Sequence, residues 1–433
     1  MGYSNMSTTK RIFYPHLRLS VSSHPTTHTP TPPHPIQMAE ETDEQQQQYK
    51  DRRLKMLKAF DETNSGVKGL IDSAGSLLKV PEIFVRPPDE LTGVHQPQRP
   101  TTRDGKTRIE VPVIDLSGVR KPDRRKLIVG EVKSASETWG FFQVVNHGIP
   151  LAVIDGMIGG VREFNDQDVV EKKKYYSRDL KRSVRFNSSY DLFTSRTASW
   201  RDTLSMSFSG PGPTDPDELP PSCRESTLEY SRHVEKLGNI VLGLLSEALG
   251  LERDHLKNME CSKGHRIHCH YYPACPEPHL VIGTAKHSDP GFITVLLQSQ
   301  NISALQVLYK SQWVDIKPTP GGLVINIGDL LQDGVLCILS NCIIFGSGPD
   351  YKLVSNGKFK SIEHRAIASH IGPRISVACF FSGPVNGSKI YGPIKQLIAE
   401  EKPIYRDVVL GEYVSKFLST GLDNYRALDY YKV

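Results

Sequence analysis

The sequence lacks any apolar run long enough to cross a bilayer, so no membrane partner is expected. It also lacks acidic residues before Glu40, whereas Lys10, Arg11 and Arg18 contribute three positive charges there. Those charges leave only about +2 of the formal net charge of +5 for the rest of the 433-residue chain. A balance this weak gives no reason to expect a nucleic-acid-binding surface, and the composition is that of a globular protein. The sequence carries no signal of an oligomeric state.

Cysteine is sparse, and its pattern contains no CxxC pair. The seven cysteines are Cys223, Cys261, Cys269, Cys275, Cys337, Cys342 and Cys379. An odd, scattered set in a long chain argues against a disulfide framework and favours a reducing compartment such as the cytoplasm. Cys269 and Cys275 lie near His270, but this spacing fits no common zinc pattern, so we expect ordinary structural cysteines.

Residues 1–50 are predicted to form a disordered extension. Residues 22–37 are rich in Pro, Thr and His, a composition that favours extended, solvated backbone. An acid-free N-terminus with Arg and Ser is also typical of plastid transit peptides, which would place the protein in a plastid. We favour the alternative that residues 1–37 are absent from the native protein, because Met38 opens a fresh acidic segment that could be the true start.

The next two hundred residues are predicted to alternate between helices and strands. Residues 51–108 hold a charged helix, expected over 49–63, and a linker punctuated by proline. An N-terminal region over 109–225 follows, with a strand at 109–116, a helix at 122–138 and a buried strand at 139–145. A capping box, Ser226 to Glu229, then predicts the start of a long helix within 226–260, which Gly250 is placed to end.

From residue 261 to 384 the pattern changes to short strands separated by turns. The expected strands are 267–272, 292–298, 305–308, 312–316, 323–327, 361–367 and 375–381. Short strands at such regular spacing predict a mainly β sandwich or barrel with flanking helices. The tail, residues 385–433, is expected to be helical and polar again.

Three short motifs on this β region carry the candidate chemistry. In His287-Ser288-Asp289, strand alternation would point an imidazole and a carboxylate to one face. Alone, such a pair is as well explained by a hydrogen bond, and a single His364 by a satisfied core histidine. Two imidazoles and one carboxylate together suit Fe(II) and leave positions open for a co-substrate and O₂. Arg374 and Ser376 share another strand face and offer a guanidinium and a hydroxyl to one carboxylate.

Longer segments around these motifs match a known family. They are VPVIDLSG, WGFFQVVNHGIP, WRDTL, HYYPACPEP, KHSDPGFITVLLQ, INIGDLLQ, NGKFKSIEHRAIA and GPRISVACFF. From about Leu54 to the C-terminus the chain therefore resembles the plant 2-oxoglutarate- and Fe(II)-dependent dioxygenases. Within them it looks most like the 1-aminocyclopropane-1-carboxylate oxidase homologue group.

The resemblance implies a double-stranded β-helix, or jelly-roll, core with His287, Asp289 and His364 as iron ligands. It implies that Arg374, Ser376 and Tyr272 bind 2-oxoglutarate. Many relatives carry Asn where this chain has His270, which leaves the contact at that position open. Phe380 matches a position that often lines the substrate pocket, although an ordinary core aromatic explains it equally well.

The activity that the resemblance implies is Fe(II)- and 2-oxoglutarate-dependent oxidation of a small plant metabolite by O₂. Succinate and CO₂ would be released, with ascorbate as reductant. Hydroxylation, desaturation, ring closure and demethylation all remain open, as does the substrate. One alternative is an ascorbate-dependent, ethylene-forming oxidase, although KHSDPGFITVLLQ looks more like the homologue group.

A second alternative is a catalytically impaired isoform, because residues 333–352 look foreign to the family. Without these twenty residues, the sequence INIGDLLQLVSNGKFKSIEHRAIA reads as an unbroken family segment. The segment contains two cysteines and an apolar run at 335–339. Our hypothesis is translated intron or an error in the gene model, and its position raises the question of whether His364 still reaches the iron.

Overall fold

The structure is a computed structural model that describes residues 43–73, 75, 77–91, 93, 109–208, 214–300, 302–332, 355, 358–384, 389–391, 394, 408–421 and 430–431. Contacts divide the chain into two units, Met1–Tyr49 and Lys50–Val433, and the second unit contains every residue with proposed chemistry. The expectations for residues 1–37 and for residues 333–352 lie outside the described residues. No helix among the described residues is long and apolar enough to span a membrane.

The core of the second unit is a jelly roll built from two sheets. In spatial order, the larger sheet contains β1 (Val113–Asp115), β2 (Phe141–Val145), β10 (Leu323–Ile327), β7 (Ile293–Gln298), β12 (Arg374–Ser382), β5 (Gly264–Tyr272), β4 (Asp202–Ser207) and β3 (Val184–Ser188). The smaller sheet contains β6 (Ile282–His287), β11 (His364–Ile367), β8 (Leu305–Tyr309) and β9 (Gln312–Asp315). All pairings in the two sheets are antiparallel except β1 with β2.

Side-chain alternation gives the larger sheet two different faces. On β12, Ile375, Val377 and Cys379 belong to the main hydrophobic cluster, as Ile267 and Cys269 do on β5. The residues between them point the other way, because successive side chains of a strand alternate between faces. The outer face is therefore apolar and packed, while the inner face, which looks toward the smaller sheet, carries the polar residues.

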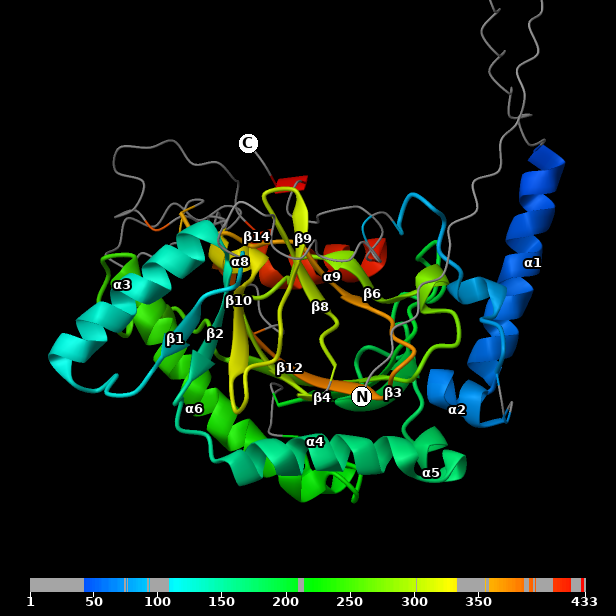
Figure 1. Ribbon diagram of the computed structural model, residues 1–433, viewed down its shortest axis with the longest axis horizontal. Coiled ribbons are helices and arrows are strands. Elements are labelled where there is room, and N and C mark those ends of the chain that lie inside the picture. Colours follow the sequence, from blue (N-terminus) through cyan, green and yellow to red (C-terminus); the bar gives the residue numbers. More distant parts are fainter. Residues whose placement is uncertain are drawn as a thin grey trace, which may run out of the picture. The chain divides into compact units, whose positions relative to one another are not determined.

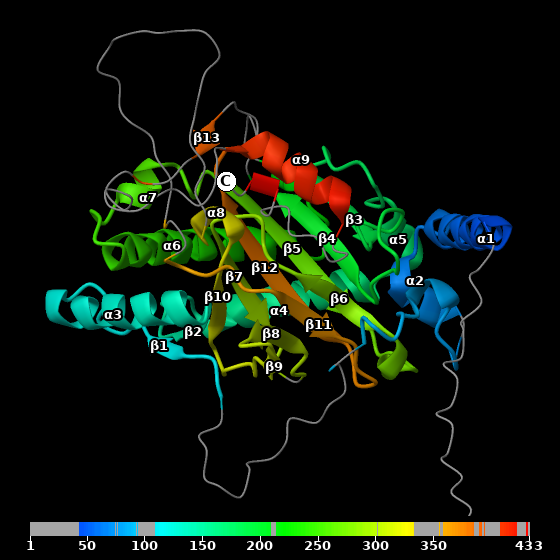
Figure 2. The ribbon, with the colours of Figure 1, turned by 90° about the horizontal axis from the view of Figure 1, so that it is seen from above.

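Helices cover the apolar face. Helices α3 (Pro122–Thr138), α4 (Leu151–Asp166) and α6 (Arg224–Ala248) pack on the larger sheet, as Figures 1 and 2 show. Tyr230, Val234, Leu237 and Val241 of α6 recur at helical spacing and are fully buried in that cluster. The other helices are α1 (Asp43–Glu62), α2 (Gly66–Ser73), α5 (Val169–Lys173), α7 (His255–Asn258), α8 (Asp329–Gln332) and α9 (Leu410–Thr420).

Three expected helix features are corrected. Residues 43–49 were assigned to the disordered extension, but they form the first turns of α1. Helix α6 begins at Arg224, not at the predicted capping box, and Ser226 donates from Oγ to the backbone oxygen of Cys223. Gly250 does follow the helix end, with φ +78°. The tail was expected to be helical, yet it also contains the β13 (Ile390–Tyr391) and β14 (Val408–Val409) ribbon.

Most expected strands are confirmed within a few residues, but β3, β4 and β6 were missed. The expected strand at 361–367 begins only at His364, and the one at 109–116 is reduced to β1. The strand argument for His287 and Asp289 was wrong, because β6 ends at His287 and Asp289 lies beyond it.

The chain on either side of residues 333–352 is tied together. The backbone N–H of Ser355 donates to the oxygen of Leu331 at 3.3 Å, and its hydroxyl donates to the oxygen of Gln332 at 3.0 Å. The side-chain oxygen of Gln332 also accepts from the backbone N–H of Ser361, just before β11. Gln332 and Ser355, the nearest described residues on either side of that segment, are therefore held side by side by hydrogen bonds.

Candidate metal centre and co-substrate pocket

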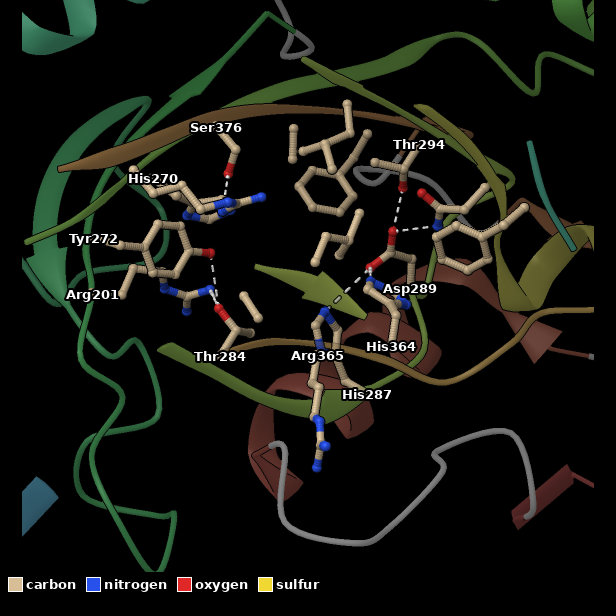
Figure 3. A pocket seen from close by; sticks show the side chains of 18 residues that line it. Arg201, His270, Tyr272, Thr284, His287, Asp289, Thr294, His364, Arg365 and Ser376 are labelled. Carbon is tan, nitrogen blue, oxygen red and sulfur yellow. Dashed lines mark hydrogen bonds and ion pairs between the residues drawn. The ribbon is translucent and has the colours of Figure 1, made fainter. Parts of the chain in front are cut away.

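Two imidazoles and one carboxylate converge between the sheets. Nε2 of His287 and Nε2 of His364 each lie 3.6 Å from Oδ1 of Asp289. The three side chains offer one ligand atom each, and these atoms lie within 4.8 Å of one another. Figure 3 shows the three side chains pointing toward one another at one end of a pocket. They form the one group of three or more such side chains placed to hold a metal ion in the described part of the chain.

The smaller sheet brings the two imidazoles together. Strand β11 pairs antiparallel with β6 in a register that places His364 opposite His287, and their rings lie 4.3 Å apart between centroids. Asp289 follows in the turn after β6. Its backbone oxygen accepts from the N–H of Asp329 at the start of α8, which holds that turn against the sheet. The carboxylate therefore reaches the imidazoles from a turn that the backbone at the start of α8 holds in place.

Each of the three side chains is oriented by a second contact. Nδ1 of His287 lies 2.8 Å from the oxygen of Ala285, and Nδ1 of His364 lies 3.2 Å from the oxygen of Ile362. These contacts assign the proton to Nδ1 and leave Nε2 of each ring free to bind a metal. Oδ2 of Asp289 accepts from Thr294 and, at 2.7 Å, from Asn326, so Oδ1 stays directed at the centre.

The electrostatics keep His287 and Asp289 in the forms that bind a metal. Burial, followed by the neighbouring His364, lowers the pKa of His287 to about 3, so its ring is neutral. Burial acts to raise the pKa of Asp289, but the two histidines and the hydrogen bonds from Thr294 and Asn326 outweigh it. The pKa of this carboxyl therefore lies below its ordinary value, and the group is an anion 4% exposed to solvent.

Asp329 connects the two segments that carry the imidazoles. This fully buried carboxylate accepts from Ser288, between His287 and Asp289, at 3.0 Å. It also accepts from Ser361, three residues before His364, at 2.7 Å, and from Tyr413 of α9 at 2.8 Å. One side chain thus fixes the turn after β6, the approach to β11 and the C-terminal helix relative to one another.

The pocket extends from this centre to a cationic end (Figure 3). It encloses about 480 Å³, including its mouth, and both sheets contribute to its lining. At the cationic end, Arg374 is 3% exposed and donates to the hydroxyl of Ser376 at 3.1 Å and to the side-chain oxygen of Gln298 at 2.8 Å. Both acceptors are neutral, and Nε of Arg374 and Nε2 of Gln298 have no hydrogen-bond partner among the described residues.

A second guanidinium, that of Arg201, lies at the same end and is 6% exposed. It donates to the hydroxyl of Thr284 at 2.8 Å, and that hydroxyl lies 3.0 Å from the hydroxyl of Tyr272. Burial acts to raise the pKa of Tyr272, but Arg201 and Arg374 outweigh it and bring the pKa below its ordinary value. The two guanidiniums therefore make this end of the pocket positive.

Two further predicted residues line the pocket. His270 lies beside Tyr272 on β5, and its Nδ1 is 3.0 Å from the hydroxyl of Thr203. Burial, with Arg201 next in effect, holds the pKa of His270 well below its ordinary value, so it adds no charge. Phe380 lies on the same face of β12 as Arg374, opposite Thr294 of β7 in the register. It is thus beside the metal-binding end of the pocket.

The donor set and the buried cations fit an iron ion with an anionic co-substrate. Two imidazole nitrogens and one carboxylate oxygen, without thiolate, suit Fe(II) and leave coordination positions for other ligands. Leaving a buried charge uncompensated costs roughly 3–5 kcal/mol, and no ion pair of Arg374 or Arg201 exists among the described residues. A carboxylate ligand would supply the missing negative charge.

Sequence reasoning missed the lining residues Arg201, Thr284, Thr294 and Asn326, and also Gln298, which holds Arg374. Each lies within or next to a segment that matched the family or a strand pattern, but nothing in the segment distinguished it from its neighbours. Alternation on β7 and β10 could have placed Thr294, Gln298 and Asn326 inward. Their contacts with Asp289 and Arg374 join different strands, so no spacing within one segment reveals them.

Known proteins resemble this chain over most of its length. The family model described as 2OG-Fe(II) oxygenase superfamily matches residues 264–383, and that of the N-terminal domain of a non-haem dioxygenase in morphine synthesis matches residues 111–226. The 1-aminocyclopropane-1-carboxylate oxidase homolog 1 of Arabidopsis thaliana is 45% identical over 88% of this chain and 97% of its own length. Deacetoxyvindoline 4-hydroxylase of Catharanthus roseus is 42% identical over 88% of this chain and 90% of its own. The crystal structure of JOX2 in complex with 2OG, Fe and JA superimposes with a TM-score of 0.69 at 26% identity, over 85% of this chain and 97% of that one.

Proposed function

The chain belongs to the 2OG-Fe(II) oxygenase superfamily, and on that premise we propose that it oxidises a small plant metabolite with O₂ and 2-oxoglutarate. It is an oxidoreductase of the dioxygenase type, and Fe(II), 2-oxoglutarate and O₂ are the cofactor and co-substrates of that family. The products would be an oxidised metabolite, succinate and CO₂. The observation that carries the proposal is one pocket with three convergent metal-binding side chains at one end and an uncompensated buried Arg374 at the other.

We assign the iron to His287, Asp289 and His364. Support comes from the convergence of their ligand atoms within 4.8 Å and from the hydrogen bonds that leave Nε2 of each ring and Oδ1 of the carboxylate directed at one point. Bound Fe(II) would supply the oxidative chemistry, namely activation of O₂ coupled to decarboxylation of 2-oxoglutarate. The side chains themselves hold the metal and fix its orientation.

We assign the far carboxylate of 2-oxoglutarate to Arg374, Ser376 and Tyr272. The guanidinium of Arg374 is held by Ser376 and Gln298 and lies 4.9 Å from the centroid of the Tyr272 ring. Such a fixed fork presents parallel N–H donors to a carboxylate. Because the residue is almost fully buried, its bonds to that carboxylate would be shielded from competing water.

The rest of the pocket would position the metabolite and keep the reaction dry. Phe141, Leu296, Leu305, Ala378 and Phe380 line the pocket with apolar surface. Apolar walls displace water from the space beside the metal, which protects a reactive centre from side reactions. Phe380 is the residue that we place against the carbon to be oxidised. The choice between hydroxylation, desaturation and demethylation depends on how a substrate lies against it.

The direct test is succinate release by the purified protein with Fe(II), 2-oxoglutarate and an extract of plant metabolites, with products followed by mass spectrometry. We expect succinate that depends on Fe(II) and 2-oxoglutarate, and one or more metabolites altered in mass. Ethylene formed from 1-aminocyclopropane-1-carboxylate with ascorbate and without 2-oxoglutarate would instead establish the ethylene-forming alternative. Complete absence of Fe(II)-dependent succinate would reject the proposal.

The proposal also includes ascorbate as the reductant and the cytoplasm as the compartment. We expect ascorbate to act as a reductant that maintains Fe(II), so turnover without it should decline with time and recover when it is added. A role in specialised plant metabolism in the cytoplasm is in keeping with the five described cysteines, Cys223, Cys261, Cys269, Cys275 and Cys379, all free and buried. Imaging of a tagged full chain would test this compartment against a plastid.

A further inference from the structure

The inner face of the larger sheet continues beyond the pocket. One row of residues crosses it from the metal-binding end: Asn326 of β10, Thr294 of β7, Phe380 of β12, Arg266 of β5 and Ser207 of β4 are successive register partners. Asn326 and Thr294 hold Asp289, and Phe380 lines the pocket. Arg266 is therefore the next inner-face residue after Phe380 in the direction away from the metal-binding end.

The adjacent row ends in a second arginine. Leu296, Ala378, His268, Ser205 and Arg185 are successive register partners across β7, β12, β5, β4 and β3. The ring of His268 lies edge-on to that of Phe380, with 4.9 Å between centroids. The inner face thus continues from Phe380, which lines the pocket, through His268 and Arg266 to Arg185, on strands that lie side by side in Figure 2.

This part of the inner face, next to the pocket, carries positive charge without a balancing carboxylate. The side chain of Arg266 has no hydrogen bond or ion pair among the described residues. That of Arg185 makes one hydrogen bond, to the backbone oxygen of Arg182 at 3.2 Å, while its Nε has none. The carboxylate nearest in effect, Asp179, is exposed and forms no ion pair with Arg185. Both arginines are only half-buried, so a ligand can approach them.

The two guanidiniums affect the pKa values of nearby side chains. Burial, then Arg266, lowers the pKa of Arg185 to about 10, so it keeps its charge in the cell. Burial, then Arg185 and Arg266, holds the pKa of His268 well below its ordinary value. His268 is therefore a neutral spacer between Phe380 and two charged side chains. A like-charged pair with no anion next to it attracts a ligand that carries one.

We propose that Arg266 and Arg185 bind an anionic group of the metabolite that is oxidised, so that the substrate is an organic acid or an acidic conjugate. The inference rests on the proposed function and names its substrate class. Arg374 and Arg201 are left to 2-oxoglutarate, because they lie at the other end of the pocket. Neighbouring strands lie about 4.8 Å apart, so Arg266, two strands from Thr294, places the anion roughly 10 Å from the metal-binding end. An acid whose oxidised carbon and anionic group lie about that far apart would reach from the metal-binding end to Arg266.

Matched compounds test the charge requirement. Purified full-length protein with Fe(II), 2-oxoglutarate and ascorbate would be given small aromatic and aliphatic acids, each paired with its methyl ester, together with sulfate and phosphate conjugates. Succinate release above the substrate-free rate is scored. We expect acids or conjugates to be oxidised and their neutral partners to be poor substrates, and the class accepted distinguishes carboxylate, sulfate and phosphate. A neutral ester oxidised as efficiently as its acid would overturn the proposal.

Variants then locate the anion. Arg266→Gln and Arg185→Gln should each raise the KM for the acid about tenfold or more, as expected for loss of a charge-assisted hydrogen bond, and should leave the KM for 2-oxoglutarate unchanged. Arg182→Gln removes the same charge from an exposed position three residues before Arg185 and is the matched control. Equal KM values for the acid in the control, Arg266→Gln and Arg185→Gln would contradict the assignment.

A second measurement needs no substrate. Crystals of the protein with Mn(II) and 2-oxoglutarate would be soaked in selenate, whose anomalous signal marks a bound dianion. We expect a selenate within hydrogen-bond distance of Arg266 or Arg185 that is lost in the Arg266→Gln, Arg185→Gln double variant. Selenate bound only elsewhere, or not at all, would contradict the proposal. Substrate-free conversion of 2-oxoglutarate to succinate tests the dioxygenase proposal separately, because it does not involve these arginines.

Discussion

The two ends of the pocket differ in how completely the protein satisfies its own polar groups. At the metal-binding end, the atoms of His287, Asp289 and His364 that do not face the centre each have a partner. At the cationic end, Arg374 and Arg201 are buried against neutral groups, and the Nε of each has no partner among the described residues. The first end is a completed scaffold for a cation. The second holds charge that the fold alone does not balance.

This difference indicates separate roles in binding. A scaffold whose supports are all in place fixes metal geometry before any ligand arrives. An uncompensated cation instead favours whichever anion enters, because the ligand relieves the cost of the buried charge. We therefore expect substitutions at the metal-binding end to reduce metal affinity and turnover together. Substitutions at the cationic end should mainly raise the concentration of 2-oxoglutarate that is required.

The largest effect should come from removing a metal ligand. His287→Ala, Asp289→Ala and His364→Ala should each lower Fe(II)-dependent succinate formation by about a thousandfold or more, because the iron would lose one of its three protein ligands. Mn(II) binding by the same variants, measured by calorimetry, should weaken in parallel. His370→Ala, at an exposed histidine near β11, is the control. Turnover like that of the unaltered protein in any ligand variant would reject that residue's assignment.

The next effect should be confined to the cationic end. Arg374→Ala should raise the KM for 2-oxoglutarate about a hundredfold while Mn(II) affinity stays unchanged, since the variant loses charge-assisted hydrogen bonds but no ligand. Arg374→Lys keeps the charge without the fork and should recover only part of the loss. Steady-state kinetics against 2-oxoglutarate give the answer. A KM equal to that of the unaltered protein would break the contrast between the two ends.

A smaller effect should follow from loosening the support of Asp289. Thr294→Val removes one hydrogen bond to Oδ2, and we expect Fe(II) affinity to fall by about ten- to a hundredfold, the usual range for groups that orient metal ligands. Thr294→Ser keeps the hydroxyl and serves as the control. The requirement for 2-oxoglutarate, measured at saturating iron, should not change. If that requirement rose instead, the two ends would be coupled through β7.

The smallest effect on either end should come from deleting residues 333–352. The hydrogen bonds of Ser355 to Leu331 and Gln332 already join the flanking chain, so Mn(II) affinity and the KM for 2-oxoglutarate should change by no more than about twofold. Thermal unfolding should occur at a higher temperature, because removing twenty residues lowers the entropic cost of bringing the flanking chain together on folding. RNA reads that join codons 332 and 353 would support the intron hypothesis. Transcripts and active protein that always contain the segment would refute it.

Comparison with the sequence shows why strands were easier to predict than their partners. Apolar alternation on β5, β7, β10 and β12 is a local signal, and those strands were located to within a few residues. Strands β3 and β4 were missed because polar residues occupy both of their faces, as in Arg185, Asn187 and Ser188. Burial of Asn187 and Ser188 depends on hydrogen bonds to other segments, from Asn187 to the oxygen of Ser177 and from Ser188 to Asp202. No local pattern reports such bonds.

The sequence by itself determined which residues are brought together as a candidate metal site. His287, Asp289, His364, Arg374 and Ser376 were named from motifs and Tyr272 from the family resemblance, and all six line one pocket. Even there the local reasoning was partly wrong, because Asp289 lies beyond the end of β6. The carboxylate arrives through a turn that Asp329 fixes from another part of the chain.

Only the tertiary structure decided what surrounds those residues. The positive charge of Arg201 beside Tyr272, the support of Asp289 by Asn326 and the row from Phe380 to Arg266 arise where strands distant in sequence become neighbours. Strand alternation assigns each side chain to a face, which a sequence can show. Register between strands assigns its neighbours, and register is set by packing of the whole sheet. That is why the candidate metal ligands could be predicted from the sequence, whereas the arginines proposed to select the substrate could not.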